Sequence, residues 1–200
     1  RHDSGRMVLC GKEVSYSSPS AAAKDGVVYL TEEREAEGMV PIASVRQNLT
    51  MSILDKISRA GILHSTRERE TAARSIDGLE IKVASQLQEV QQLSGGNKQK
   101  VLVGRVMEQH PRVCLLDEPT RGVDIEAKDS ILHSINHGFR DNACALITSP
   151  GVEDLMLICD RILVLYQGRI TEEFARKEFS EEDIYRAMQG ETIHRKEAAS

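Results

Sequence analysis

The chain has 200 residues, 40% of them hydrophobic, and a formal net charge of −5 at pH 7. This length and composition suit one ordinary globular domain with a sizeable core. The acidic balance and the lack of a long basic run argue against nucleic acid as the main partner, because neutralising phosphates requires clustered Lys and Arg.

The first part of the chain predicts short strands and one helix. Two β-like runs, Met7–Cys10 and Glu13–Tyr16, flank a Gly-Lys turn, and a short helix is predicted over Ala21–Asp25. Val27–Leu30 then has the pattern of a buried strand. Its carboxyl end carries the polar run Thr31–Arg34, which would share a sheet edge with any parallel neighbour.

Residues 33 to 92 show a polar, helical pattern. Helices are predicted over Val45–Ile57 and Ser65–Ile76, the second with Ser65 as N-cap and Glu68 completing a capping box. A third helix is predicted between Ser85 and Gln92. Because apolar residues are sparse here, these helices would form a small subdomain against the main sheet.

Leu93–Asn97 is a glycine-rich loop that opens a predicted helix, Lys98–Gln109. A helix start offers unpaired backbone N–H groups and the positive end of the dipole to an anion. Gly95 and Gly96 allow an anion close to the backbone, while Ser94 and Asn97 add side-chain hydrogen bonds. The loop therefore predicts a phosphate-type anion site.

A buried strand, Val113–Leu116, follows and delivers two adjacent acids, Asp117 and Glu118, to its carboxyl end. The apolar run predicts a strand buried on both faces, and α/β sheets place their sites at this edge. One acid can hold Mg²⁺ through water, and the other can polarise an attacking water. A phosphate-binding helix start followed by this pair indicates nucleotide hydrolysis.

The rest of the chain alternates helices and strands. Asp124 is predicted to cap a helix running to about Phe139, and a buried strand, Ala143–Thr148, ends at Ser149. The predicted elements that follow are a helix at Val152–Cys159, strands at Arg161–Leu165 and Arg169–Phe174, a capped helix from Ser180 to about Met188, and a polar tail at Glu191–Ser200.

The cysteines and apolar runs indicate the compartment. Cys10, Cys114, Cys144 and Cys159 form no CxxC pair, and three of them lie in apolar runs that predict buried, reduced thiols. The longest apolar stretches are strand-sized, and nothing resembles a signal peptide. The sequence thus predicts a cytoplasmic chain whose membrane contact comes through a partner.

These motifs carry a family resemblance. LSGGN-KQK resembles the signature motif of ABC ATPases, with Asn97 where most members have Gln. CLLDEP resembles their Walker B strand, and TRGVD resembles their D-loop. The combination of SGGNKQKV and EPTRGVDIEAK is similar to the ATP-binding subunits of bacterial sugar importers, which carry two fused ATPase halves. Two motifs in this order and spacing are far more specific than either alone.

The resemblance implies an α/β P-loop NTPase fold of the ABC type, a three-layer sheet with a helical subdomain. Residues 1–32 and 111–190 would form the ATPase core, residues 33–110 the helical signature subdomain, and residues 191–200 a polar tail. No G-x-x-x-x-G-K-[ST] occurs in the sequence. We therefore interpret the chain as the C-terminal part of a second ATPase half, without the P-loop strand and helix.

In this family the P-loop strand lies between the strands corresponding to Ala143–Thr148 and Arg161–Leu165. Without it, two apolar edges would have unpaired backbone groups. We expect the gap to be closed by strand rearrangement or by another chain, or the C-terminal part to be displaced.

The resemblance also implies site roles, with ATP and Mg²⁺ as cofactors. Asp117 would hold Mg²⁺ through water, and Glu118 would be the general base. The implied nucleotide-binding residues are Ser94, Gly95, Gly96, Asn97, Glu32, Asp124 and Ser149. The glycine-rich loop Leu93–Asn97, called the signature loop below, would act in trans by closing over ATP held by the other half. Asp124 would couple the two ATP sites.

Two of these positions depart from the common pattern. Glu32 stands where the Q-loop usually has Gln, which changes how this loop would coordinate metal and water. Ser149 stands where a histidine usually meets the γ-phosphate, and a hydroxyl cannot supply imidazole proton chemistry near neutral pH. The site on Asp117 and Glu118 is therefore expected to hydrolyse ATP weakly or not at all.

The resulting expectation is an ATPase subunit that energises carbohydrate import from the cytoplasmic side of the inner membrane. Its partners would be transmembrane permease subunits, the other ATPase half or a second copy and, indirectly, a periplasmic solute-binding protein. The apolar loop Met39–Ile42 is either core or a docking surface for a transmembrane subunit. Alternatives are a nucleoside or signalling-molecule importer, a DNA-repair-type ABC ATPase, and a non-enzymatic interaction module.

Overall fold

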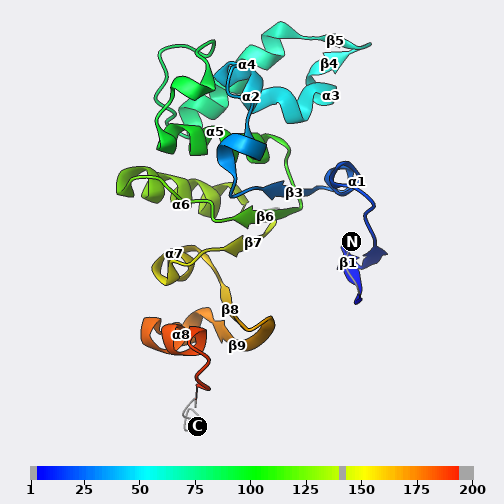
Figure 1. Cartoon of the computed structure of the whole chain (residues 1–200). Coiled ribbons are helices and arrows are strands. Elements are labelled where there is room, and N and C mark those ends of the chain that lie inside the picture. The colour runs from blue at the N-terminus through cyan, green and yellow to red at the C-terminus, as the bar shows by residue number, and fades with distance from the viewer. Residues whose placement is uncertain (1–3, 140–142, 194–200) are drawn as a thin grey trace. The chain divides into compact units, whose positions relative to one another are not determined.

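The structure is a computed structural model that describes residues 4–139 and 143–193. The chain divides into two compact units, Arg1–Thr148 and Ser149–Ser200 (Figure 1). The first unit contains both the predicted N-terminal strands and the predicted helical region. Most of the predicted tail, from residue 194 onward, lies outside the described residues.

A parallel sheet forms the centre of the first unit. Its strands lie in the order β3 (Val27–Leu30), β6 (Val113–Asp117) and β7 (Cys144–Thr148) (Figure 1). The positions of the predicted strands are confirmed, but β7 was predicted to be buried and is exposed along most of its length, including Cys144. In the register, Leu30 pairs with Leu116 and Asp117 with Thr148, so the three carboxyl ends meet at one edge.

The two faces of this sheet differ in burial. Val28, Leu30, Cys114 and Leu116 are buried on the face that packs against helices, and burial raises the pKa of the Cys114 thiol to about 12. The opposite face bears Leu146, which is 57% exposed. On β6 itself, Val113 and Leu115 of this second face are only half-buried, so the prediction that the strand is buried on both faces is wrong.

A group of helices packs around α5 (Gly95–Glu108), which itself contacts β3 of the sheet. The group includes α2 (Val45–Thr50), α4 (Ser65–Gly78) and α6 (Ile125–Phe139). Helix α5 is the central element of this group, since it contacts α2, α4, α6 and β3. None of the described helices combines the length and hydropathy that a membrane span requires.

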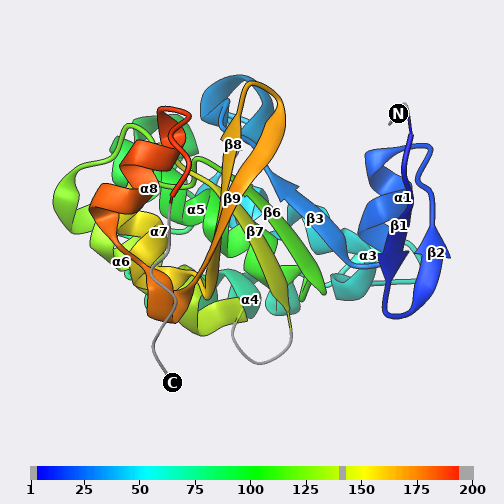
Figure 2. The same ribbon diagram turned by 90° about the horizontal axis from the view of Figure 1, so that it is seen from below.

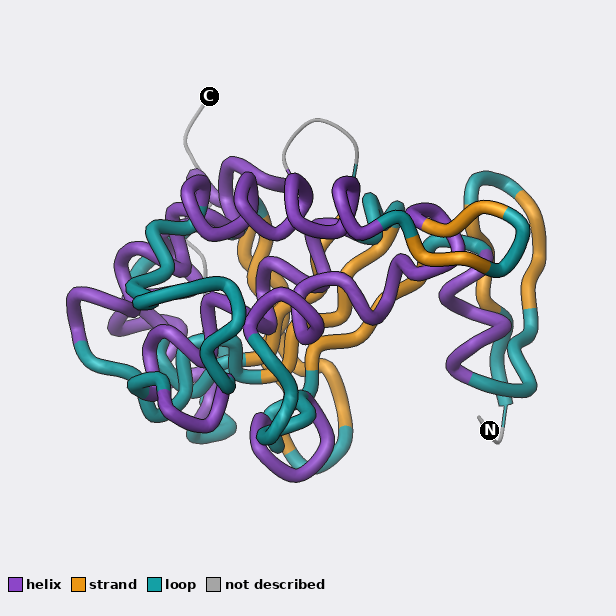
Figure 3. The backbone as a smooth tube through the Cα atoms, turned by 90° about the horizontal axis from the view of Figure 1, so that it is seen from above, coloured by secondary structure: helices purple, strands orange, loops and turns teal. Residues whose placement is uncertain are grey.

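The predicted helix Val45–Ile57 is interrupted. Helix α2 is followed by a 3-10 turn at Met51–Ile53 and a short helix, α3 (Leu54–Ile57). The Thr50 hydroxyl donates to the Arg46 carbonyl at 2.9 Å, a local bond that competes with regular helix geometry. An antiparallel hairpin that the sequence analysis did not predict, β4 (Ser58–Arg59) with β5 (Ile62–Leu63), follows α3 (Figure 3).

The predicted helix between Ser85 and Gln92 is also wrong, because only Val90–Gln92 forms a 3-10 turn. The backbone of this segment pairs instead with the chain before α2. The Val45 N–H donates to the Gln88 carbonyl at 2.9 Å, and the Val90 N–H donates to the Ala43 carbonyl at 3.1 Å. These long-range bonds outweigh the weak tendency of so short a segment to form a helix.

The predicted capping box at Ser65 and Glu68 is wrong as well. Ser65 is the first residue of α4, and no side chain caps this helix. The buried Glu68 carboxylate instead forms an ion pair with Arg46 at 3.2 Å. A capping box does occur at the start of α2, where Ser44 and Gln47 bond each other's backbone N–H groups.

The N-terminal elements agree with the sequence prediction. Strands β1 (Met7–Leu9) and β2 (Lys12–Val14) form an antiparallel hairpin. Helix α1 (Pro19–Lys24) follows, with the Ser18 hydroxyl accepting from the Ala21 N–H at its start. Figure 2 shows this hairpin beside α1, with β3 leading from α1 into the sheet.

The second unit has a small core of its own. It contains α7 (Val152–Ile158), the antiparallel strands β8 (Arg161–Tyr166) and β9 (Arg169–Ala175), and α8 (Glu181–Met188). These elements confirm the predicted ones. The core residues are Val152, Ile162, Val164, Phe174, Ile184 and Ala187.

Strands β7 and β8 belong to different sheets, and apolar side chains remain exposed on both. Leu146 of β7 and Leu163 and Leu165 of β8 are exposed. Exposed apolar strand residues favour pairing with further chain. How the predicted gap between the two strands is closed stays a prediction.

Gly104 offers a test of the packing around α5. A Cβ atom at Gly104 would lie 2.8 Å from Leu79 Cδ1 and 2.9 Å from Leu49 Cδ2, whereas one at Gly78 would meet nothing within 4 Å. Replacing Gly104 by Ala should lower the free energy of unfolding by about 1 kcal/mol, because an overpacking cost of ~1–3 kcal/mol exceeds the helix-propensity gain. The matched change Gly78→Ala should raise it by up to ~1 kcal/mol.

Urea denaturation of both variants would measure the difference. Equal changes in the two variants would show that α5 is not tightly packed at Gly104.

Candidate functional site

The glycine-rich loop forms the start of α5 as a capped helix terminus. Ser94 is the N-cap, and its hydroxyl oxygen accepts from the Asn97 backbone N–H at 3.4 Å and from Asn97 Nδ2 at 2.9 Å. Asn97 Oδ1 also accepts from the Lys82 N–H at 2.8 Å. The Asn97 side chain thus forms hydrogen bonds within the chain that fix the shape of the loop. Its predicted role, a hydrogen bond to a bound anion, stays a prediction.

Both glycines of this loop lie against the chain that follows Glu118, Gly95 against the loop before α6 and Gly96 against the first turn of α6. A Cβ atom at Gly96 would lie 2.5 Å from Ala127 Cβ, and one at Gly95 would lie 3.3 Å from the Gly122 carbonyl oxygen. The Gln99 side chain, buried, donates to the Pro119 carbonyl at 2.7 Å. The start of α5 is therefore held closely against the chain that follows Glu118.

Asp117 lies at the carboxyl edge of the sheet between two hydroxyl donors. Thr148 Oγ1 donates to Asp117 Oδ1 at 2.5 Å, and the Tyr29 hydroxyl donates to Asp117 Oδ2 at 2.9 Å. The hydrogen bond to the Asp117 carboxylate is the main cause that raises the pKa of Tyr29. The three groups come from β6, β7 and β3, so the edge assembles them only because the strands are parallel.

This arrangement fits a magnesium ion held through water. Each carboxylate oxygen of Asp117 accepts one hydrogen bond and keeps further lone pairs. Mg²⁺ commonly retains several waters and takes one or two carboxylates. The described residues hold no group of three or more His, Cys, Asp and Glu placed to bind a metal ion.

Glu118 adopts a left-handed backbone conformation, with φ of 43°. Its N–H donates to the Thr148 carbonyl at 3.1 Å. A non-glycine residue in this conformation is strained and needs such support from its surroundings. Strand β6 ends at Asp117, and the chain turns at Glu118. The two acids therefore have different surroundings.

Arg121 lies between two acids. Its guanidinium is paired with the Glu32 carboxylate, and its Nε lies 3.7 Å from Glu118 Oε2. The structure thus brings Glu32, from the end of β3, and Glu118, from the end of β6, to the same cation. Sequence analysis named both acids but not Arg121, whose only signal was its place in TRGVD.

The remaining predicted residues have separate places. Asp124 Oδ1 accepts from the Ala127 N–H at 2.9 Å, which confirms that Asp124 caps α6. Ser149 belongs to the second unit, where its hydroxyl oxygen accepts from the Gly151 N–H at 3.1 Å. Sequence analysis also missed Tyr29 and Thr148, because strand residues of these types carry no motif signal.

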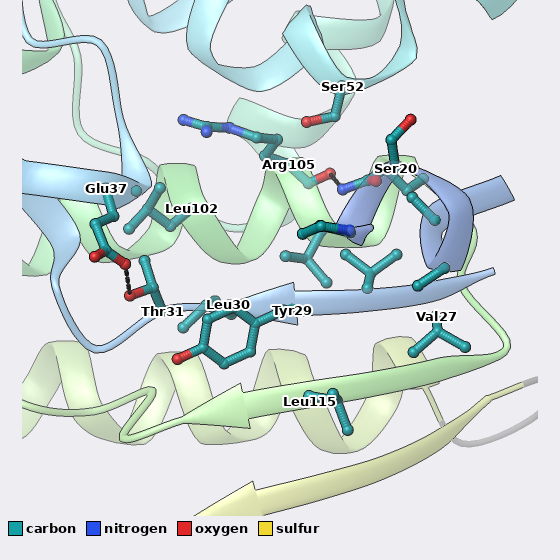
Figure 4. A pocket seen from close by; sticks show the side chains of 17 residues that line it. Ser20, Val27, Tyr29, Leu30, Thr31, Glu37, Ser52, Leu102, Arg105 and Leu115 are labelled. Carbon is teal, nitrogen blue, oxygen red and sulfur yellow. Dashed lines mark hydrogen bonds between the residues drawn. The ribbon is translucent and has the colours of Figure 1, made fainter. Parts of the chain in front are cut away.

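A pocket of about 610 Å³ lies beside the site between α1, β3 and α5 (Figure 4). Its wall is mostly apolar, and Figure 4 shows Leu30, Leu102 and Leu115 on it. Arg105 also lines it, but the guanidinium donates to the Asn48 carbonyl at 2.7 Å and to Asn48 Oδ1 at 3.1 Å. Burial lowers the pKa of Arg105 to about 10.

Comparison with known proteins identifies the relatives of this chain. The sequence pattern described as "ABC transporter" matches residues 1–121. The ribose import ATP-binding protein RbsA of Caldanaerobacter subterraneus subsp. tengcongensis is 38% identical over 190 residues, which cover 94% of this chain and 38% of that protein. The arabinose import ATP-binding protein AraG of Pectobacterium atrosepticum is 37% identical over 90% of this chain and 36% of that protein. The chain thus spans well under half the length of these relatives.

Solved structures show the fold. A dimeric, post-hydrolysis ATP-binding cassette, MJ0796, bound to ADP and Pi, matches with a TM-score of 0.74 at 17% identity, covering 88% of this chain and 75% of that one. The ATP-binding cassette MJ1267 matches with a TM-score of 0.73 at 19% identity, covering 94% and 74%. The predicted fold class, an α/β ABC cassette with a parallel sheet, is confirmed. The chain belongs to the ABC transporter family and is related to the ATP-binding subunits of ribose and arabinose importers.

Proposed function

We propose that this chain is the C-terminal ATP-binding half of a subunit that energises carbohydrate import. The observation that carries the proposal is the capped, glycine-rich start of α5 held against the loop that follows Asp117 and Glu118. It combines an anion-binding helix start with a carboxylate pair at a sheet edge. Relatives that import ribose and arabinose support a sugar as cargo. A nucleoside or a signalling molecule is the alternative cargo.

The proposed chemistry divides between the two motifs. Mg²⁺, when bound with ATP, neutralises charge on the phosphates. Asp117 holds it through water, and Glu118 accepts a proton from the attacking water. Because Ser149 stands where the family usually has a histidine, we expect this pair to support only weak hydrolysis. Glu32, paired with Arg121, is placed to sense changes at Glu118.

The signature loop acts in trans in this proposal. The backbone N–H groups of Gly95 and Gly96 and the hydroxyl of Ser94 meet the γ-phosphate of ATP held by another half or a second copy. The solved relative MJ0796 is a dimer bound to ADP and Pi, which supports paired cassettes. Asp124, which caps α6 beside Gly96, couples the two sites.

Contact with transmembrane subunits is assigned to the loop Met39–Ile42. Met39 is buried, whereas Val40 is exposed and Ile42 is 75% exposed. The core and docking interpretations thus apply to different residues of the loop. Asn48 fixes the loop from within, since its side chain bonds both the N–H and the carbonyl of Val40. Through such a permease, the subunit would lie at the cytoplasmic side of the membrane and meet a solute-binding protein only indirectly.

The domain division remains part of this proposal: an ATPase core of residues 1–32 and 111–190 and a signature subdomain of residues 33–110. The DNA-repair alternative would require long coiled-coil insertions. The longest described helix, α6, has only 15 residues, which favours transport. A non-enzymatic interaction module remains the alternative for the chain acting by itself.

The first test is binding of Mg·ATP to this chain alone. The sequence has no G-x-x-x-x-G-K-[ST], so the phosphates lack their usual cradle. We expect isothermal titration calorimetry at high protein concentration to show no saturable binding. Micromolar binding would mean that another segment of this chain holds the phosphates, and the interpretation that the chain lacks a phosphate cradle would be wrong.

The second test compares the two motifs in the full-length subunit. Replacing Ser94 by Arg should lower ATPase activity on the order of a hundredfold, because it obstructs the N–H groups that stabilise developing charge. Glu118→Gln should lower activity only modestly. The exposed Ser17, changed to Arg, serves as the matched control and should leave activity unchanged. Equal losses from the Ser94 and Glu118 changes would contradict the proposed asymmetry.

A further inference from the structure

Arg34 lies where three loops of the first unit meet. It is the first residue of a single π-helical turn, Arg34–Gly38, that follows β3. Its Nη1 donates to the Gly95 carbonyl at 2.9 Å, and its Nη2 donates to the Gly122 carbonyl at 3.5 Å. One guanidinium therefore joins the start of α5 to the loop between Glu118 and Asp124.

The fit around this guanidinium is close. Gly122 has a φ of 65°, and a Cβ atom there would lie 3.1 Å from Arg34 Nη2. A Cβ atom at Gly95 would lie 3.3 Å from the Gly122 carbonyl oxygen. The two glycines thus leave room for the planar fork of Arg34, which presents its donors in a fixed geometry.

Charged residues on either side of Arg34 form ion pairs with the same two parts of the chain, α5 and the loop after Glu118. Glu32 pairs with Arg121, which precedes Gly122. The Glu35 carboxylate accepts from Lys98 Nζ of α5 at 2.5 Å, and this hydrogen bond lowers the pKa of Glu35. Contacts from a four-residue stretch therefore reach α5 twice and the loop after Glu118 twice, with Arg34 making one contact of each kind.

The geometry of the peptide group gives these contacts a consequence. The peptide unit between Gly95 and Gly96 is planar and trans, so its C=O and its N–H point in opposite directions. Holding the Gly95 carbonyl toward Arg34 therefore fixes the Gly96 N–H on the side away from Arg34. That N–H belongs to the first turn of α5, where backbone donors have no partner within the helix.

We propose that Arg34 is a positioning residue for the signature loop, which it aims by holding the carbonyls of Gly95 and Gly122. This inference rests on the proposed function for its consequence in catalysis. Its structural part, the orientation of the loop, does not depend on nucleotide. Arg34 does not itself touch ATP in this proposal.

The test measures backbone order in this chain without nucleotide. Amide ¹⁵N relaxation should give order parameters of about 0.85 at Gly95, Gly96 and Gly122 in the unchanged chain and below ~0.6 in Arg34→Ala. Arg34→Lys keeps the positive charge but lacks the two-pronged guanidinium, so the order parameter of at least Gly122 should stay low in this variant. The control is Arg74→Ala, because the exposed Arg74 bonds only the Thr71 hydroxyl among the contacts described and lies on α4.

A second measurement, the urea midpoint of the same variants, distinguishes positioning of the two loops from a general contribution of Arg34 to stability. The urea midpoint of Arg34→Ala should match that of Arg74→Ala, so that loss of order is confined to the two loops. Unchanged order parameters in Arg34→Ala would overturn the positioning role, as would full restoration by Arg34→Lys. A fall in the urea midpoint beyond the control, with order lost throughout the first unit, would overturn it too.

The catalytic consequence is tested in the full-length subunit. Arg34→Ala should lower kcat on the order of tenfold to a hundredfold, with KM for Mg·ATP nearly unchanged, since misplacing a contact group by ~1 Å costs about this much. A loosened loop in the chain, combined with full activity of the Ser94→Arg subunit, would instead overturn the proposed function. The order parameters of the Arg34 variants thus test the positioning role of Arg34, and the activity of the Ser94→Arg subunit tests the proposed function.

Discussion

The close approach of α5 to the chain between Pro119 and Ala127 is the constraint on which the first unit depends. It requires glycine at position 96, where a Cβ atom would lie 2.5 Å from Ala127 Cβ, and it buries the Gln99 side chain against the Pro119 carbonyl. Because a buried polar group is costly without a partner, that bond fixes the position of α5 along its axis. The helix start, with its orphan N–H groups, is consequently held at a defined place relative to Glu118.

The acids at the sheet edge have different surroundings because of the parallel strand pairing and the turn of the backbone at Glu118. Asp117 remains in the strand and receives two hydroxyl donors from neighbouring strands. Glu118 leaves the strand through a left-handed turn and lies near Arg121, which also pairs with Glu32. The two adjacent carboxylates thus have different neighbours.

Two of the predictions that failed share a cause. The helix predicted at Ser85–Gln92 is replaced by backbone bonds to residues 43 and 45, and Glu68 pairs with Arg46 instead of capping α4. In both cases a partner distant in sequence offered a better bond than the local pattern did. The strand prediction for Val113–Leu116 was correct in type and wrong in burial, because a run of apolar residues does not reveal which of its faces is covered.

The sequence by itself determined most of the strands, the helix that follows the glycine-rich loop, the acid pair and the family, because these depend on short-range patterns and on spacing along the chain. Only the tertiary structure decided that Tyr29 and Thr148 would bond Asp117, and that Arg34 would join Gly95 to Gly122. Arg34 and Gly122 are 88 residues apart. No local pattern specifies such a contact, since it arises from parallel strand pairing and from the packing of α5 on the sheet.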